Sequence, residues 1–197
     1  MCLSGARIRD VAAMDQALEM LAGCGPEFGG IGLSNHGPMA AEALSALGRE
    51  QEVEPWVERY RKRLIERPPK VEHIDALNWP EVLGEVDRST DWEDFFAAEL
   101  DSAPWREVLE RWVPLLSAGM MAGATHGIIR TGHAVRSLAA DESAPERRVE
   151  LSRGLAYWAA RYQVLPGVPH PGAEPRLPSA ALPRLPIIPA NCVTRVP

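Results

Sequence analysis

The sequence predicts an all-α fold in which about seven helices pack around a buried, glycine-rich central helix. In seven segments the apolar residues recur at helical spacings of three and four, and no segment shows the alternating pattern of a strand. The end of the chain differs, because nine of the last thirty-two residues are proline and no periodicity is present. Such a composition does not pack a core and is typical of an extended or disordered tail. We therefore expect a helical domain at residues 1–166 and an irregular tail at residues 167–197.

The predicted helices have start and stop signals. The clearest lie in segment 34–50, where Ser34 and Asn35 are capping residues, Pro38 suits the first turn and Gly48 suits the end. In chain order we expect helices at residues 11–23, 34–50, 52–66, 91–100, 105–116, 119–141 and 147–164, with a glycine-rich loop at residues 24–34 and a single helical turn at residues 79–83.

Residues 119–141, GMMAGATHGIIRTGHAVRSLAAD, form the predicted central helix. Gly119, Gly123 and Gly127 recur every four residues, so on one helix they lie in a single smooth stripe. A glycine costs a helix about 1 kcal/mol relative to alanine, and a stripe of three indicates that a neighbouring backbone approaches closely. We expect this neighbour to be the helix that follows His36.

Three polar residues, His126, Arg130 and His133, lie inside this apolar segment. The two histidines are seven residues apart, which is two helical turns, and their side chains therefore point to the same side. An unpaired buried polar group costs about 1–3 kcal/mol, so each of the three needs a partner. From spacing alone the histidines are either hydrogen-bonded core residues or ligands of a metal or a small molecule. We expect Arg130 to pair with a carboxylate that the sequence does not identify.

His36 lies just before the N-terminus of a predicted helix. The helix dipole lowers the pKa of an imidazole in this position and favours the neutral form, which binds metals. No zinc-protease, di-iron, phosphate-binding or nucleophile motif is present in the sequence. His36 is therefore a further candidate ligand, whereas His73 is expected to be solvated in a charged loop.

Composition excludes some classes of function and sets the expected compartment. The 197 residues are 46% hydrophobic and 24% charged, which is ordinary for a globular protein. A net charge of −6 without a Lys/Arg-rich block argues against nucleic-acid binding, and no apolar run is long enough for a membrane span. Because Cys2, Cys24 and Cys192 are odd in number and have no metal-type spacing, we expect reduced thiols in a cytoplasmic protein.

Three blocks of this sequence resemble the questin oxidase-like family. They are SNHGPMAAEALSA at residues 34–46, HGIIRTGHAVRSL at residues 126–138 and ELSRGLAYWAARYQVLP at residues 150–166. The resemblance covers roughly residues 12–166 in the family's order and approximate spacing. The NHGPMA and THGIIRTGHA motifs are specific in combination, although each is modest alone.

The resemblance implies an oxidoreductase that carries out oxygen-dependent Baeyer–Villiger or ring-cleaving oxidation of polycyclic aromatic polyketides such as anthraquinones. It also implies a non-haem iron held chiefly by histidines, with NADPH as the reductant. His36 and His126 match family ligand positions, and His133 matches a less constant position that faces the substrate. We therefore assign metal binding to His36 and His126, and catalytic roles to His133 and Arg130.

The family resemblance also bears on how much of the active site this chain carries. Questin oxidase-like proteins usually run far beyond 197 residues, and further histidines and a lysine in their C-terminal half contribute to the site. The resemblance thus implies that this chain is an N-terminal portion, which binds metal weakly and does not turn over substrate by itself. The alternative function is that of a non-catalytic helical protein that binds a small molecule or a partner. Exposed apolar faces predict self-association into a homo-oligomer.

Overall fold

The computed structural model describes residues 13–28, 32–165, 177–181 and 183. The chain divides into two units, Met1–Val164 and Leu165–Pro197, which we treat separately. In the second unit the described residues include one short helix, α9 (Pro178–Ala181), within a range for which the composition predicts irregular structure. All further features belong to the first unit.

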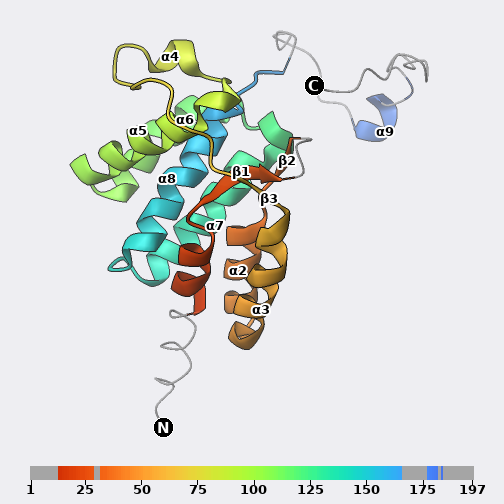
Figure 1. Cartoon of the computed structure of the whole chain (residues 1–197). Helices are drawn as coiled ribbons and strands as arrows, with labels where there is room; N and C mark the ends of the chain where they lie inside the picture. Colours follow the sequence, from red (N-terminus) through yellow and green to blue (C-terminus); the bar gives the residue numbers. More distant parts are fainter. Residues whose placement is uncertain (1–12, 29–31, 166–176, 182, 184–197) are drawn as a thin grey trace. The chain divides into compact units, whose positions relative to one another are not determined.

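The first unit is mainly helical, as the sequence predicts (Figure 1). Residues 13–20 are helical, and the elements that follow in chain order are β1 (Cys24–Phe28), β2 (Leu33–Ser34), α2 (Gly37–Ala46), α3 (Glu50–Tyr60), η1 (Arg61–Arg63), β3 (Leu64–Glu66), α4 (Trp79–Val82), η2 (Val86–Arg88), α5 (Ser89–Ser102), α6 (Trp105–Ser117), η3 (Ala122–Thr125), α7 (His126–Ala140) and α8 (Pro145–Ala160). No helix of the described residues is long and apolar enough to cross a membrane.

The main apolar core lies where α5, α6 and α7 pack around α8. Its largest members include Trp92, Phe96, Trp112, Leu155 and Trp158, all at most 3% exposed. Three of these rings contact one another edge to face or in stacks, with centroids 5.1–5.7 Å apart for Phe96 against Trp92 and Trp112. Burial of side chains of this size contributes about 1.5–3 kcal/mol each, so this cluster dominates the stability of the unit.

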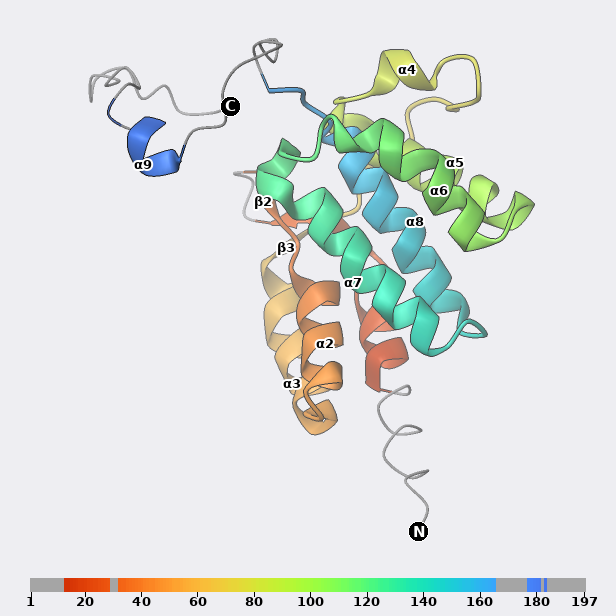
Figure 2. The ribbon, with the colours of Figure 1, turned by 180° about the vertical axis from the view of Figure 1, so that it is seen from behind.

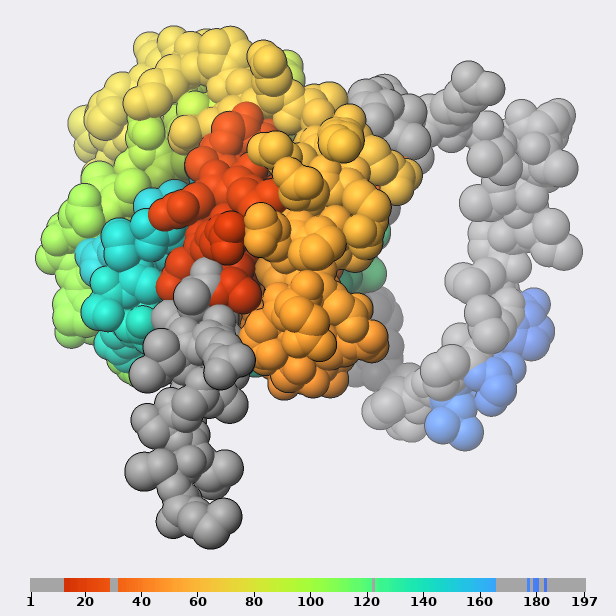
Figure 3. All heavy atoms as spheres, turned by 60° about the horizontal axis from the view of Figure 1, so that its bottom comes forward, coloured from red at the N-terminus to blue at the C-terminus, as the bar shows by residue number. Residues whose placement is uncertain are grey.

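A second apolar cluster joins the N-terminal helical residues 13–20 to α2 and α3. Leu18 packs there with Val53 and Val57, which are 0% exposed. In Figure 3 the red N-terminal helix lies between the orange α3 and the cyan start of α8. This cluster holds α2 against the rest of the unit, and α2 in turn lies beside α7 (Figure 2).

A small antiparallel sheet with strand order β2-β1-β3 corrects two of the sequence predictions. Residues 24–34 contain strands where a loop was expected, and the predicted helix 52–66 ends at Tyr60, before β3. The strands are only two to five residues long, and their stability comes from pairing with distant partners such as Cys24 with Glu66. A Cβ on Gly25 would lie 2.8 Å from the Glu66 carbonyl oxygen, so this glycine permits a close strand contact. Strand pairing between distant segments leaves no periodic pattern in the local sequence, so it was not predicted from the sequence.

The predicted glycine-rich central helix is also corrected. Gly119 lies in a turn after α6, Gly123 lies in η3 with φ +54°, and only Gly127 lies in α7. The glycines do not face α2, because a Cβ on Gly127 would come within 2.6 Å of the Trp158 backbone in α8. A Cβ on Gly119 would likewise collide with the ring of Tyr162. The close approach that the glycines predict does exist, but it is made to α8 and the residues that follow it.

Candidate functional site

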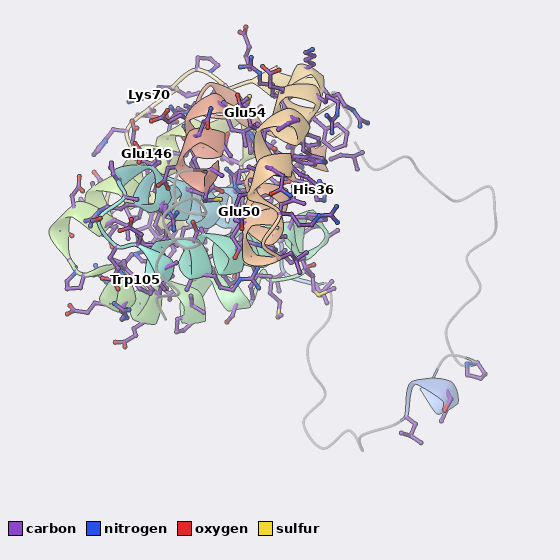
Figure 4. The ribbon with its side chains drawn as sticks, turned by 90° about the horizontal axis from the view of Figure 1, so that it is seen from below. His36, Glu50, Glu54, Lys70, Trp105 and Glu146 are labelled. Atoms are coloured by element: carbon purple, nitrogen blue, oxygen red, sulfur yellow. The ribbon has the colours of Figure 1, made fainter. Side chains whose placement is uncertain are left out.

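The backbone around His36 is fixed by the sheet and by α3. The Asn35 amide donates to the Gly25 carbonyl at 3.0 Å, and its own oxygen accepts from the Gly37 N–H at 2.8 Å. The backbone N–H of His36 donates to the Tyr60 hydroxyl at 2.8 Å. His36 therefore lies at the N-terminus of α2, as predicted, but it is itself the N-cap residue, one position after the expected capping residues Ser34 and Asn35. Its ring remains exposed at the margin of the unit (Figure 4).

His126 follows a left-handed turn. Gly123, Ala124 and Thr125 have φ values of +54°, +51° and +67°, and α7 begins immediately after them. A non-glycine residue in this region costs about 1–3 kcal/mol and is maintained by its surroundings, often next to a functional group. The turn brings the Gly123 carbonyl to 2.8 Å from the Nδ1 atom of His126. A carbonyl only accepts, so Nδ1 of His126 carries the proton and the neutral ring has a free lone pair on Nε2.

The two imidazoles meet although ninety residues separate them in the chain. Their Nε2 atoms are 3.0 Å apart, and the ring centroids lie 4.8 Å apart with the planes at 87°. The prediction that His36 and His126 approach each other is confirmed. Burial lowers the pKa of the His36 imidazole, the neighbouring His126 charge lowers it further, and a hydrogen bond to the Ser34 backbone offsets part of the shift. The neutral, ligating form of His36 is thus favoured.

The separation of the two nitrogens fits a shared cation. Two unprotonated nitrogens repel each other at this distance unless a proton or a metal ion lies between them. Two imidazoles bound at right angles to one metal, each with a bond of about 2.1 Å, place their nitrogens about 3.0 Å apart. Among the described residues, however, no group of three or more His, Cys, Asp or Glu is arranged to hold a metal. The pair therefore fits part of a metal's ligand set.

Tyr157 of α8 lies close to the segments that precede the two histidines. Its hydroxyl is 2.8 Å from the Ser34 Oγ atom and donates to Glu27 at 3.2 Å. The same hydroxyl lies 3.5 Å from a Cβ built on Gly123. Arg161 completes the network by donating to Glu27 at 2.6 Å. Burial raises the pKa of Tyr157, so the hydroxyl stays protonated and ties α8 to β1 and β2 next to His36.

His133, assigned a catalytic role from the sequence, lies on the same side of α7 as His126. Its Nδ1 atom is 2.5 Å from the Glu42 carboxylate of α2, and Arg136 also binds this carboxylate. The sequence did not identify Glu42, because nothing in α2 alone indicates that its position faces α7. The expectation that His126 and His133 point to one side is confirmed, since each contacts α2 or its N-cap.

Arg130 forms a buried ion pair with Glu150 of α8. Two guanidinium nitrogens, Nε and Nη2, donate to the two carboxylate oxygens at 2.6 and 2.9 Å. The side chains of Arg130 and Glu150 are 6% and 3% exposed. The predicted pairing with a carboxylate is confirmed, whereas a catalytic role for Arg130 stays a prediction. His73 is exposed, as expected.

Comparison with known proteins identifies the family of this chain. The model of the questin oxidase-like family matches residues 33–173, which include both segments of the histidine pair. No curated protein and no solved structure matches the chain. Since the matched range covers most of the sequence, the chain belongs to the questin oxidase-like family. Membership suggests an oxidase-type function.

Proposed function

We propose that this protein acts in the oxygen-dependent oxidation of polycyclic aromatic polyketides of the anthraquinone type. The observation that supports the proposal is the His36–His126 pair, which lies within the matched range and joins two nitrogens at 3.0 Å. The chain holds the ring of His126 through its other nitrogen, which donates to the Gly123 carbonyl, and it holds the backbone of His36 through the Tyr60 hydroxyl. Such outer hydrogen bonds are the usual means by which ligand histidines are oriented.

The metal of this proposal is a non-haem iron held by His36 and His126. Imidazole nitrogens suit iron, and iron with open coordination positions would activate O₂ or bind an ionised phenol.

The two candidate reactions, Baeyer–Villiger oxidation and ring cleavage, differ in their balance of electrons. In a Baeyer–Villiger reaction one oxygen atom enters a carbon–carbon bond next to a carbonyl group. The other oxygen becomes water, for which NADPH and a proton supply two electrons and two protons. In ring cleavage by a dioxygenase both oxygen atoms enter the product, and no reductant is consumed.

The second candidate function is that of an aromatic-binding protein without turnover. This candidate is favoured by the small number of metal-ligating side chains. At the pair, the described residues provide two histidines and no third protein ligand for a metal. Affinity falls with each ligand that water replaces, so on this count we expect weak iron binding by the 197-residue chain. The two candidates make different predictions for oxygen consumption.

The test combines metal content with oxygen uptake. The chain is loaded with Fe(II) under anaerobic conditions, and bound iron is measured for wild type, His36→Gln, His126→Gln and the control His73→Gln. His73 is exposed, so its replacement should leave iron binding unchanged. We expect loss of at least 10-fold in iron affinity for the first two variants only, in line with the effect of removing a group that holds or orients a metal.

Oxygen uptake with a hydroxyanthraquinone, with and without NADPH, then separates the candidates. Uptake that requires iron supports the oxidase, and its dependence on NADPH distinguishes Baeyer–Villiger chemistry from ring cleavage. Binding of the aromatic compound without any oxygen uptake favours the second candidate. Equal iron binding by wild type and by both site variants contradicts the assignment of His36 and His126.

A further inference from the structure

A second polar group lies along the α2–α7 contact, apart from the histidine pair. His133 and Arg136 of α7 both bind the carboxylate of Glu42 in α2. The Glu42 side chain is 9% exposed, that of His133 is 23% exposed and that of Arg136 is 61% exposed. The carboxylate is therefore enclosed, whereas the imidazole reaches the surface of the unit.

Two groups contact Nδ1 of His133, the Glu42 carboxylate at 2.5 Å and Nη2 of Arg136 at 3.0 Å. Because Nη2 of Arg136 already donates to Glu42, we take the shorter contact to the carboxylate as the hydrogen bond of Nδ1. An ionised carboxylate only accepts hydrogen bonds, and the bond of 2.5 Å to Glu42 therefore places a proton on Nδ1 of His133. Arg136 donates through Nε and Nη2 to the two oxygens of the same carboxylate, as in a bidentate pair. The other nitrogen of the ring, Nε2, has no hydrogen-bond partner among the residues that the structure describes. A carboxylate that orients an imidazole with a free Nε2 is an arrangement that serves proton transfer.

Between this group and the histidine pair, α7 exposes the apolar side chain of Ile129. Ile129 lies three residues after His126 and four before His133, so the three side chains share one face of α7. Its side chain is 41% exposed, and a Cβ on the adjacent Gly132 would meet no atom within 4 Å. The two imidazoles are about 10 Å apart along the helix axis, because seven residues rise 1.5 Å each. A fused-ring aromatic compound with hydroxyl groups matches this face in its length and in its chemistry.

We propose that His133, oriented by Glu42, accepts the proton of a phenolic hydroxyl of an aromatic ligand that lies over Ile129. The proton moves from the phenol oxygen to Nε2 of His133, while the Nδ1 proton stays in its bond to Glu42. The products of the step are the phenolate and an imidazolium that the Glu42 carboxylate stabilises. The choice of a phenolic aromatic ligand rests on the proposed function. His133 touches the ligand, and Glu42 is a positioning residue.

The first experiment uses a phenol that reports its own ionisation. 2-Hydroxyanthraquinone changes its visible absorption on ionisation, and unsubstituted anthraquinone serves as a ligand control without an acidic proton. Absorption is recorded about one pH unit below the pKa of the free probe, with the whole chain as wild type, His133→Gln or the control His73→Gln. We expect bound phenolate with wild type and with His73→Gln, and binding at least 10-fold weaker with His133→Gln, which corresponds to one pKa unit. Anthraquinone should bind the three proteins equally.

The second experiment tests the positioning role without a ligand. The ¹⁵N shifts of the His133 ring report its tautomer in wild type, in Glu42→Gln and in the control Glu142→Gln. Glu142 pairs with Arg106 at 2.8 Å on the surface and contacts no histidine in the described structure. We expect the Nδ1–H tautomer in wild type and in Glu142→Gln, and a mixture of both tautomers in Glu42→Gln, with reduced ionisation of the probe. Arg136 remains largely solvated after this replacement, so the fold should persist.

The outcomes separate this inference from the proposed function. Equal ionisation of the probe by wild type and His133→Gln overturns the inference, as does failure of wild type to bind the probe. An unchanged tautomer in Glu42→Gln overturns the positioning role. If the probe is ionised as expected but no oxygen is consumed, the inference stands and the oxidase proposal fails. If oxygen is consumed and His133→Gln ionises the probe as wild type does, the proposal stands and the inference fails.

Discussion

The two faces of α7 are built on different principles. On the face toward α8, Gly127 lies against the backbone of Trp158 and Thr131 lies against Gly154, with 2.6 and 3.0 Å to the Cβ positions that these glycines lack. On the face toward α2, His126 and His133 reach their partners through polar atoms. Ile129, which lies between the two histidines in sequence, is left 41% exposed. The first face is close-packed, whereas the second is open.

This difference indicates which property each face constrains. Where backbones touch, steric fit restricts the choice of residue, and substitutions change the folding stability. Where polar side chains meet at an exposed edge, chemistry restricts the choice, and substitutions alter binding with little loss of stability. We therefore expect stability and ligand binding to be separable along a single helix. The predictions below test this separation, from the largest expected effect to the smallest.

The largest effect is expected for Arg130→Ala on the α8 face. The replacement leaves Glu150, whose side chain is 3% exposed, as an uncompensated buried charge. Breaking a buried ion pair in this way costs about 3–5 kcal/mol. The free energy of unfolding, measured by urea denaturation near pH 7, should fall by this amount.

The control for this prediction is the double variant Arg130→Met with Glu150→Leu. Both charges are removed together, so we expect it to recover most of the lost stability. The same variant tests the catalytic assignment of Arg130. If it folds and retains iron-dependent activity, Arg130 has a structural role only. A single variant Arg130→Ala as stable as wild type would contradict the buried pair.

The second effect compares two glycines on the same helix. In Gly127→Ala the new Cβ meets the Trp158 backbone at 2.6 Å, which forces α7 and α8 apart and should cost about 1–3 kcal/mol. Gly132 lies five residues later on the open surface, where a Cβ meets nothing within 4 Å. Gly132→Ala should therefore stabilise the protein by about 0.5–1 kcal/mol, through helix propensity alone. Thermal or urea unfolding of the two variants gives the comparison, and changes of the same sign would contradict it.

A third, smaller effect concerns Tyr157 of α8, whose hydroxyl contacts β1 and β2 next to His36. Tyr157→Phe removes the hydroxyl that contacts Ser34 and Glu27, and should lower the free energy of unfolding by about 1 kcal/mol. The control is Tyr162→Phe, because the Tyr162 hydroxyl has no hydrogen-bond partner in the described part of the chain. If the network also orients the histidine pair, only Tyr157→Phe should weaken iron binding. Equal stability of both variants would show that the Tyr157 network contributes nothing.

The sequence predicts the helices better than their contacts. The helical spacing of Trp105, Val108 and Trp112 reports burial within one element, and α6 was expected close to its observed bounds. The meeting of His36 with His126 was predicted through the family resemblance, since spacing alone left core and ligand roles open. Glu42, Glu150 and the three strands were missed, because each depends on a partner that is remote in sequence. The glycines at positions 119, 123 and 127 correctly predicted a close backbone contact. The expected partner, α2, was wrong, because small residues show that a neighbour comes close but not which neighbour it is.

The smallest expected effect is a pH dependence of stability that comes from the histidine pair in the metal-free protein. Burial, together with the charge on His126, lowers the pKa of His36. The unfolded chain therefore binds a proton at His36 more readily than the folded chain, and folding stability rises with pH in this window. The contribution is fully present above the ordinary histidine pKa of about 6.5 and is lost as the pH falls toward the lowered value. Because the ring is largely exposed, solvent screening keeps the effect below about 1 kcal/mol.

Urea unfolding in the presence of a chelator, at pH values between 5 and 8, measures this dependence. We expect His36→Gln to show a smaller rise in stability with pH than wild type, since the titrating ring is gone. His73→Gln, which removes an exposed histidine outside the pair, should keep the wild-type slope. His126→Gln should also reduce the slope, because it removes the charge that opposes protonation of His36. If His36→Gln retains the full wild-type slope, the neutral form of His36 is not favoured by folding. The α2 face would then lack the neutral imidazole that we expect to distinguish it from the α8 face.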